Sequence, residues 1–273
     1  MDTIEIRGLE IAFERRGSGP ALVLLHGILQ DSRSWRPQLD AFTNEYTVVA
    51  WDAPGCGRSQ DPPATFRMPD YADCLAALID TLDLGRPHVV GLSLGAVVAL
   101  ELYRRHPAVP KSLVLASAYA GWAGSLPAEV VEQRLAQALR EADLPASEFV
   151  PDWIPGLLTG SAAPSLVGEV EAMMSEFHPA GYRAMARGLA EANLRDMLPR
   201  IHVPTLLLYG AVDRRSPLSV AADLHARIPR SSLVVLPGAG HLANLEAPER
   251  FTAELRDFLG GVERGASVGS MGG

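Results

Sequence analysis

Three side chains of this sequence have the types and the setting needed for nucleophilic chemistry at a carbonyl group. Ser93 lies at the centre of Gly91-Leu92-Ser93-Leu94-Gly95, a G-x-S-x-G pattern. A serine hydroxyl is a weak nucleophile until a base removes its proton, and the base needs an acid that fixes its tautomer. His241 and Asp213, each in a glycine-containing loop behind an apolar run, are the candidates for base and acid. These residues predict a Ser-His-Asp triad.

The residues around Ser93 favour a sharp turn between a strand and a helix. Residues 87–90 are typical of a short buried strand, and residues 94–106 have the apolar pattern of a helix. A serine on such a turn projects its hydroxyl away from the sheet, and the flanking glycines let the backbone turn tightly. The start of the helix also directs backbone N–H groups toward the place where an oxyanion would form. We therefore expect a nucleophile elbow at Ser93.

A parallel sheet would bring the three side chains together. Continuous apolar runs indicate strands that are buried on both faces and covered by helices. Such runs occur at residues 21–25, 47–51, 89–90, 112–116, 205–209 and 232–236, after an antiparallel hairpin over 3–7 and 10–15. Asp213 and His241 follow the last two runs. Both are expected at the carboxyl edge of the sheet, where Ser93 emerges and where ligands bind in such sheets.

The alternation of strands and helices stops between residues 117 and 200. This stretch has no convincing strand, and its helical patterns at 128–142, 165–174 and 180–194 are separated by prolines. An insertion of this size between sheet elements is typical of a lid over a binding site. We divide the chain into a first core segment (1–118), a helical lid (119–199), a second core segment (200–260) and a Gly- and Ser-rich tail (261–273), which we expect to be disordered.

Two backbone amides are candidates for stabilising the negative oxygen of a tetrahedral intermediate. One is the N–H of Leu94, directly after Ser93. The other is the N–H of Ile28, in the loop after the run at 21–25. His26 in the same loop is expected to brace it rather than to take part in the chemistry. The sequence thus predicts an oxyanion hole formed by Ile28 and Leu94.

Composition and charge argue against several other classes of function. The chain has 273 residues, 48% hydrophobic and 21% charged, and its net charge of −8 argues against nucleic acid as a partner. The acidic amino terminus lacks the apolar core of a secretory signal, and no segment has the length of a membrane span. Cys56 and Cys74 cannot make a disulfide framework and fit a reducing, cytoplasmic location. No histidine has the spacing typical of a metal site.

Five ordered motifs resemble those of the α/β-hydrolase superfamily. They are His26-Gly27, the Asp-Ala-Pro-Gly-Cys-Gly-Arg-Ser loop at 52–59, the elbow at 91–95, the loop at 209–213 and Gly240-His241. The resemblance extends over residues 3–118 and 200–260. It implies a mostly parallel eight-stranded sheet with helices on both faces and a helical lid inserted after the sixth strand. Segments at 178–182, 194–201 and 241–246 look most like those of 3-oxoadipate enol-lactonases and related esterases.

The resemblance implies hydrolysis of a small-molecule carboxylic ester or lactone through an acyl-enzyme on Ser93, without metal or organic cofactor. The elbow serine distinguishes the chain from haloalkane dehalogenases and epoxide hydrolases, which place an aspartate there. The meta-cleavage C–C bond hydrolases usually carry a tryptophan after the catalytic histidine, where this chain has Leu242. C–C bond hydrolysis, the cofactor-free perhydrolase (haloperoxidase) reaction and a slow-turnover ligand receptor remain alternatives.

The expected lid contains the candidates for substrate contact. Its large apolar side chains either line the substrate pocket or pack the lid onto the core: Trp122, Trp153, Met173, Met174 and Tyr182. Three arginines of the same region could pair with a substrate carboxylate or simply occupy exposed helix positions: Arg183, Arg187 and Arg195. His178 lies in the same region and could face the substrate, although a surface position is favoured. Ser93 thus indicates the chemistry, whereas the lid would select the substrate.

Overall fold

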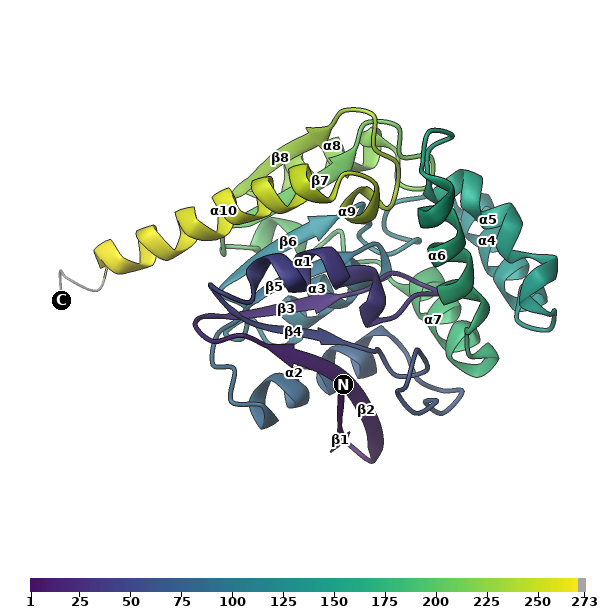
Figure 1. Ribbon diagram of the computed structural model, residues 1–273, viewed down its shortest axis with the longest axis horizontal. Coiled ribbons are helices and arrows are strands. Elements are labelled where there is room, and N and C mark those ends of the chain that lie inside the picture. The colour runs from purple at the N-terminus through teal and green to yellow at the C-terminus, as the bar shows by residue number, and fades with distance from the viewer. Residues whose placement is uncertain (270–273) are drawn as a thin grey trace.

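The computed structural model describes residues 1–269, in which eight strands form one sheet in the order β1-β2-β4-β3-β5-β6-β7-β8 (Figure 1). The strands are Asp2–Ile6 (β1), Leu9–Arg16 (β2), Ala21–Leu25 (β3), Thr47–Trp51 (β4), His88–Leu92 (β5), Ser112–Ala116 (β6), Thr205–Gly210 (β7) and Ser231–Leu236 (β8). β1 pairs antiparallel with β2, and β2 with β4, whereas the remaining pairs are parallel. The mostly parallel eight-stranded sheet expected from the sequence is confirmed.

Helices cover both faces of this sheet. In Figure 1, α1 and α10 lie in front of the sheet and contact each other, while α2 packs against α3 behind it. The core helices are Arg36–Phe42 (α1, preceded by the 3-10 turn η1, Ser32–Trp35), Met68–Thr81 (α2), Leu94–Arg105 (α3), Leu218–Arg227 (α8), Ala243–Glu246 (α9) and Pro248–Gly269 (α10). Every residue of β4, β5 and β6 is buried. Their uninterrupted apolar sequences require this cover on both sides.

Four helices connect β6 to β7 beyond the carboxyl ends of the parallel strands (Figure 1). This helical insertion consists of Ala128–Glu141 (α4), Val150–Leu157 (α5), Pro164–Ser175 (α6) and Pro179–Glu191 (α7), with the 3-10 turns Ala146–Glu148 (η2) and Leu198–Arg200 (η3). α4, α6 and α7 match helices predicted from the sequence, but α5 was not predicted. Its proline Pro151 lies in the first turn, where a backbone N–H has no helical partner to lose.

The helical insertion sits directly on the backbone of the core where α7 meets the loop after β4. A Cβ atom at Gly181 would collide with the carbonyl oxygen of Gly55, and a Cβ atom at Gly55 would collide with the backbone of Gly181. Gly55 also has a φ of +81°, a conformation that other residues rarely adopt. Glycine at both positions therefore lets the two backbones touch.

The carboxyl-terminal helix is longer than the sequence predicts. The sequence predicts a final helix over 248–259 and disorder from residue 261, but α10 continues to Gly269. Glu263 explains part of this difference, because its carboxylate pairs with Lys111 at 2.6 Å and with the Nε2 atom of His88 at 2.7 Å. The tertiary contact offsets the poor helix propensity of the glycines there. Residues 270–273 of the expected tail lie outside the described residues.

His26 joins two loops at the carboxyl edge of the sheet. Its Nδ1–H donates to the carbonyl oxygen of Gly27 at 2.8 Å, and its Nε2 accepts from the N–H of Ala53 at 2.9 Å. One donating and one accepting nitrogen require the neutral ring. Burial lowers the pKa of His26, consistent with that neutral form. The predicted bracing role of His26 agrees with these two hydrogen bonds.

The stability of the fold should therefore fall as the pH is lowered through 6.5, the ordinary pKa of histidine. Below that pH, His26 is protonated in the unfolded chain but remains neutral in the folded chain. His26 therefore lowers the free energy of unfolding by up to about 1.4 kcal/mol for each pH unit. Urea unfolding between pH 5 and 8 measures the slope. His26→Asn should be less stable at pH 7 and show a shallower slope, whereas the variant of exposed His202, His202→Asn, keeps the wild-type slope. Equal slopes for His26→Asn and wild type would contradict this account.

Candidate active site

Ser93 occupies a strained turn between β5 and α3. Its φ of +53° and ψ of −107° lie outside the conformations that most residues adopt. A Cβ atom at Gly91 would collide with the carbonyl group of Gly95, and a Cβ atom at Gly95 would collide with the carbonyl groups of Leu25 and His26. Glycine at 91 and 95 therefore makes the turn possible. The Ser93 side chain is only partly buried at this turn.

His241 and Asp213 form a buried pair at the same edge of the sheet. The Nδ1 atom of His241 lies 3.0 and 2.9 Å from the two carboxylate oxygens of Asp213. Oδ1 of Asp213 also accepts from the N–H groups of Arg215 and Ser216, each at 2.9 Å. Burial alone would raise the pKa of Asp213, but His241, the Ser216 amide and the Ser117 hydroxyl outweigh it and lower the pKa. Asp213 is therefore ionised at neutral pH and holds Nδ1 protonated, which leaves Nε2 as a basic nitrogen.

The carboxyl end of β6 connects the serine turn with the histidine loop. The N–H of Ser93 donates to the carbonyl oxygen of Ala116 at 2.9 Å, and the hydroxyl of Ser117 donates to the carbonyl oxygen of His241 at 2.9 Å. Within residues 1–269, no hydrogen bond joins Ser93 Oγ to the His241 ring. In free enzymes such contacts often close only when substrate binds. The arrangement places a serine and a histidine–aspartate pair around one strand end.

The two amides expected to stabilise an oxyanion lie beside the serine turn. Leu94 is the first residue of α3, so its N–H has no carbonyl partner within the helix. Ile28 lies in the loop after β3, which bends at Leu29 with a φ of +60°. Over the described range neither amide donates a hydrogen bond to another protein group. Because β3 and β5 are neighbours in the sheet, both donors face the same edge.

The apolar side chains expected in the lid are all buried, with different surroundings. Met173 and Tyr182 line a cavity of about 10 Å³ together with Leu29 of the Ile28 loop. Trp122 and Met174 are packed within the protein. The indole N–H of Trp153 and the hydroxyl of Tyr182 both donate to the buried carboxylate of Glu141, at 3.1 and 2.6 Å. Only Met173 and Tyr182 are thus placed beside the loop that carries Ile28.

Two of the three arginines considered for a substrate carboxylate are engaged elsewhere. Arg183 pairs with Asp143, and Arg195 pairs with Asp223 at 3.4 Å. Arg187 on α7 is half-buried. His178 contacts Asp61 at 2.8 Å and also lines the small cavity beside Met173 and Tyr182. Of these three arginines, Arg187 is the one that forms no ion pair with a described residue.

Arg215, which sequence reasoning missed, lies between the Asp213 loop and the helical insertion. Its guanidinium group is 3.8 Å from the centre of the Trp153 ring and lies along Gly156 of α5. Its carbonyl oxygen accepts from the hydroxyl of Tyr119 and from Arg134. Among residues 1–269 no carboxylate forms an ion pair with its guanidinium, and burial lowers its pKa. Its position two residues after Asp213 was the signal that could have drawn attention to it.

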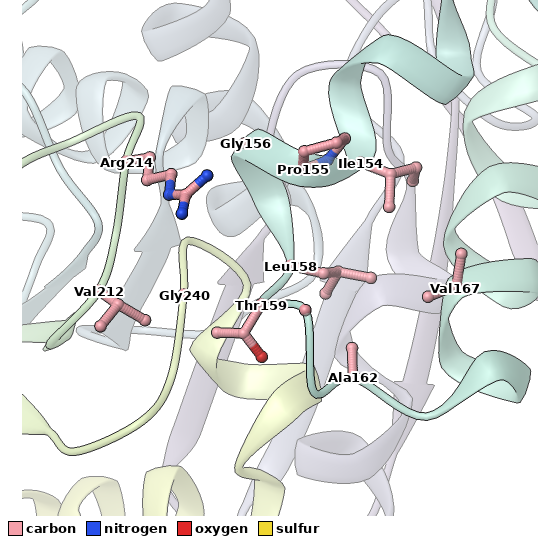
Figure 2. A pocket seen from close by; sticks show the side chains of 11 residues that line it. Ile154, Pro155, Gly156, Leu158, Thr159, Ala162, Val167, Val212, Arg214 and Gly240 are labelled. Atoms are coloured by element: carbon pink, nitrogen blue, oxygen red, sulfur yellow. The ribbon is translucent and has the colours of Figure 1, made fainter.

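A pocket of about 500 Å³ lies beside the Asp213–His241 pair (Figure 2). One wall consists of α5 and the turn that follows it, and the other consists of Val212, Arg214 and Gly240. Figure 2 shows the Arg214 guanidinium between this loop and Gly156. The pocket thus separates the helical insertion from the loops that carry the acid and the base.

The described residues offer neither a membrane-spanning helix nor a metal-binding cluster. No helix among them has the length and apolarity to cross a membrane. The same residues contain no group of three or more His, Cys, Asp or Glu side chains arranged to hold a metal ion. Cys56 and Cys74 are buried and unpaired with each other. The serine turn and the histidine–aspartate pair remain the candidate active site.

Comparisons with known proteins agree with this architecture. The thermophilic esterase of Thermogutta terrifontis, solved with bound malate, superimposes with a TM-score of 0.90 at 32% identity, over 96% of this chain and 99% of that one. The 3-oxoadipate enol-lactonase 2 of Acinetobacter baylyi is 28% identical over 92% of this chain and 93% of its own length. The (E)-2-((N-methylformamido)methylene)succinate hydrolase of the same organism is 27% identical over 89% and 92%.

The sequence model described as the alpha/beta hydrolase family matches residues 22–254, which includes Ser93, Asp213 and His241. The match spans the core and most of the chain beyond it, including the helical insertion. The chain belongs to the alpha/beta hydrolase family, and its similarity to named hydrolases supports a hydrolase.

Proposed function

We propose that this protein hydrolyses carboxylic esters or lactones of small molecules through Ser93, His241 and Asp213. The observation that carries the proposal is the buried hydrogen bond of 2.9 Å between Asp213 and Nδ1 of His241, at the sheet edge where Ser93 is held in a strained turn. An ionised aspartate on Nδ1 leaves Nε2 free to accept a proton. The named esterase and lactonase relatives support the same reaction type.

The proposed reaction proceeds in two acyl-transfer steps. Ser93 Oγ attacks the carbonyl carbon while Nε2 of His241 takes the hydroxyl proton, and Asp213 stabilises the resulting imidazolium. The carbonyl oxygen becomes negative and accepts from the amides of Ile28 and Leu94. His241 returns the proton to the leaving alkoxide, which leaves an acyl group on Ser93. Water then attacks the acyl-enzyme with the same proton transfers, and no metal or organic cofactor enters any step.

The helical insertion is proposed to act as a lid over this site, and the unpaired cysteines fit the proposed cytoplasmic location.

Three alternative functions would use the same residues. C–C bond hydrolysis predicts turnover of vinylogous 1,5-diketones rather than simple esters. A perhydrolase would form a peracid from a carboxylic acid and hydrogen peroxide. A ligand receptor would be labelled by a fluorophosphonate at Ser93 but turn esters over at nearly the uncatalysed rate.

Ser93→Ala should lower the turnover of p-nitrophenyl acetate by about four orders of magnitude or more, because it removes the nucleophile and leaves only binding and the oxyanion amides. Steady-state kinetics and circular dichroism would measure activity and fold together. The exposed Ser175 on α6 provides the control, since Ser175→Ala should keep wild-type turnover. A folded Ser93→Ala protein with most of its activity would contradict the assignment.

We further propose that the substrate carries a second, ionised carboxylate that binds Arg215. The support is a guanidinium stacked on Trp153 beside the Asp213 loop, without an ion pair among the described residues. A carboxylate is the group whose geometry matches the donors of a guanidinium. The names of the relatives include an oxoadipate and a succinate derivative, and the similar esterase was solved with malate.

Arg215→Gln should lower kcat/KM for monomethyl succinate by about tenfold to a hundredfold, the value of a hydrogen bond to a charged group. It should change kcat/KM for uncharged methyl butyrate much less. Kinetics on both esters, with wild type and variant, measure the ratio. Arg86→Gln removes an exposed charge just before β5, at the opposite edge of the sheet, and should leave the ratio unchanged. An equal loss on both esters would show that Arg215 does not bind the carboxylate.

A further inference from the structure

The carboxylate of Glu246 lies five residues after His241 and binds two segments that are distant in the chain. Its Oε2 atom accepts from the N–H of Gly240 at 2.6 Å. Its Oε1 atom accepts from the N–H of Thr159 at 2.6 Å and from the Thr159 hydroxyl at 2.7 Å. Hydrogen bonds to a carboxylate at these lengths are strong ones. Both oxygens of Glu246 are therefore occupied.

The two segments belong to different parts of the fold. Gly240 directly precedes His241, whereas Thr159 lies in the turn after α5 of the helical insertion. Figure 2 shows Thr159 beside the loop that carries Gly240, and both residues line the 500 Å³ pocket. A second bond of 3.1 Å, from the N–H of Leu242 to the carbonyl oxygen of Leu157, connects the same two segments. The histidine loop is thus attached to the insertion on both sides of His241.

Little space is left for the loop to move within this contact. A Cβ atom at Gly240 would lie 2.8 Å from Oε2 of Glu246 and 3.1 Å from the carbonyl oxygen of Leu157. On the core side, the loop is held through the Ser117 hydroxyl at the His241 carbonyl oxygen. Asp213 orients the ring, but these backbone contacts decide where the ring is placed.

We propose that Glu246 is a positioning residue for His241. The position of the proposed base then depends on how the helical insertion is placed on the core. This inference rests on the proposed function, because it matters for turnover only if His241 is the base. Movement of the turn at Thr159 would pull on Glu246 and so on the N–H of Gly240. The carboxylate acts through the backbone and touches neither substrate nor the reacting atoms.

Glu246→Gln is the sharpest variant, because an amide of the same size has one accepting oxygen where the carboxylate has two. Either Gly240 or Thr159 would then face an NH2 group. We expect kcat for p-nitrophenyl acetate to fall about tenfold to a hundredfold, the cost of a misplaced group near the chemistry, with little change in KM. Thr159→Val, which keeps the Thr159 N–H bond and removes only the hydroxyl, should lower kcat less.

Glu191→Gln is the matched control. Glu191 ends α7 and pairs with Arg67 of the core at 3.0 Å, so its loss removes a contact between insertion and core that does not involve the histidine loop. This variant should keep wild-type kcat and KM. A role of Glu246 in stability alone would lower the melting temperature and leave kcat per folded molecule unchanged, which would overturn the proposal.

Amide hydrogen exchange separates a failure of this inference from a failure of the proposed function. In Glu246→Gln, peptides covering 238–242 and 157–160 should exchange faster than in wild type, whereas in Glu191→Gln they should not. This readout requires no turnover. If wild type is inactive on esters but the exchange result is as expected, Glu246 still connects the histidine loop with the turn at Thr159, and only the proposed function fails. Unchanged exchange in both segments would overturn the inference whatever the activity.

Discussion

The site depends on the contact of Gly95 with the carbonyl groups of Leu25 and His26. This contact places the first turn of α3 against the end of β3, and Ser93, at the turn between β5 and α3, has a positive φ. It also puts the Ile28 loop next to the first amide of α3. The nucleophile candidate and both candidate oxyanion amides therefore lie at the ends of neighbouring strands of one sheet, and such rigid elements position groups more precisely than free loops do.

The acid and base candidates are held in place by hydrogen bonds within loops. Asp213 and His241 lie in loops, and their placement comes from hydrogen bonds to buried groups rather than from strand geometry. Burial strengthens these bonds, since little water competes with them. The helical insertion contributes to the same network through Thr159, so it does more than cover the sheet edge. Within the insertion, the buried carboxylate of Glu141 accepts from Trp153 and Tyr182, and Arg215 of the Asp213 loop packs on the same Trp153 ring.

Much of this arrangement could be predicted from local patterns. Uninterrupted apolar runs predicted strands β3 to β8, because strands inside a parallel sheet are buried on both faces; β8, at the edge of the sheet, is only partly buried. The glycines around Ser93 predicted the turn, and loop positions after two strands predicted that Asp213 and His241 would meet. The predictions failed where a tertiary contact outweighs local propensity. α5 forms despite its prolines, and α10 continues through glycines to Gly269 because Glu263 is tied to Lys111. Arg183 and Arg195 are engaged in surface ion pairs that no local pattern reveals.

The sequence by itself determined the fold family and the three residues of the candidate triad, because both can be recognised from local patterns. These patterns are apolar runs, tight glycine turns and positions directly after strands. Only the tertiary structure decided how the insertion meets the site. Glu246 and Thr159 are 87 residues apart, and Arg215 and Trp153 are joined only by the packing of α5 on the Asp213 loop. Contacts between such distant segments depend on how the helices pack on the core. The apolar periodicity of one segment does not identify the segment that it contacts.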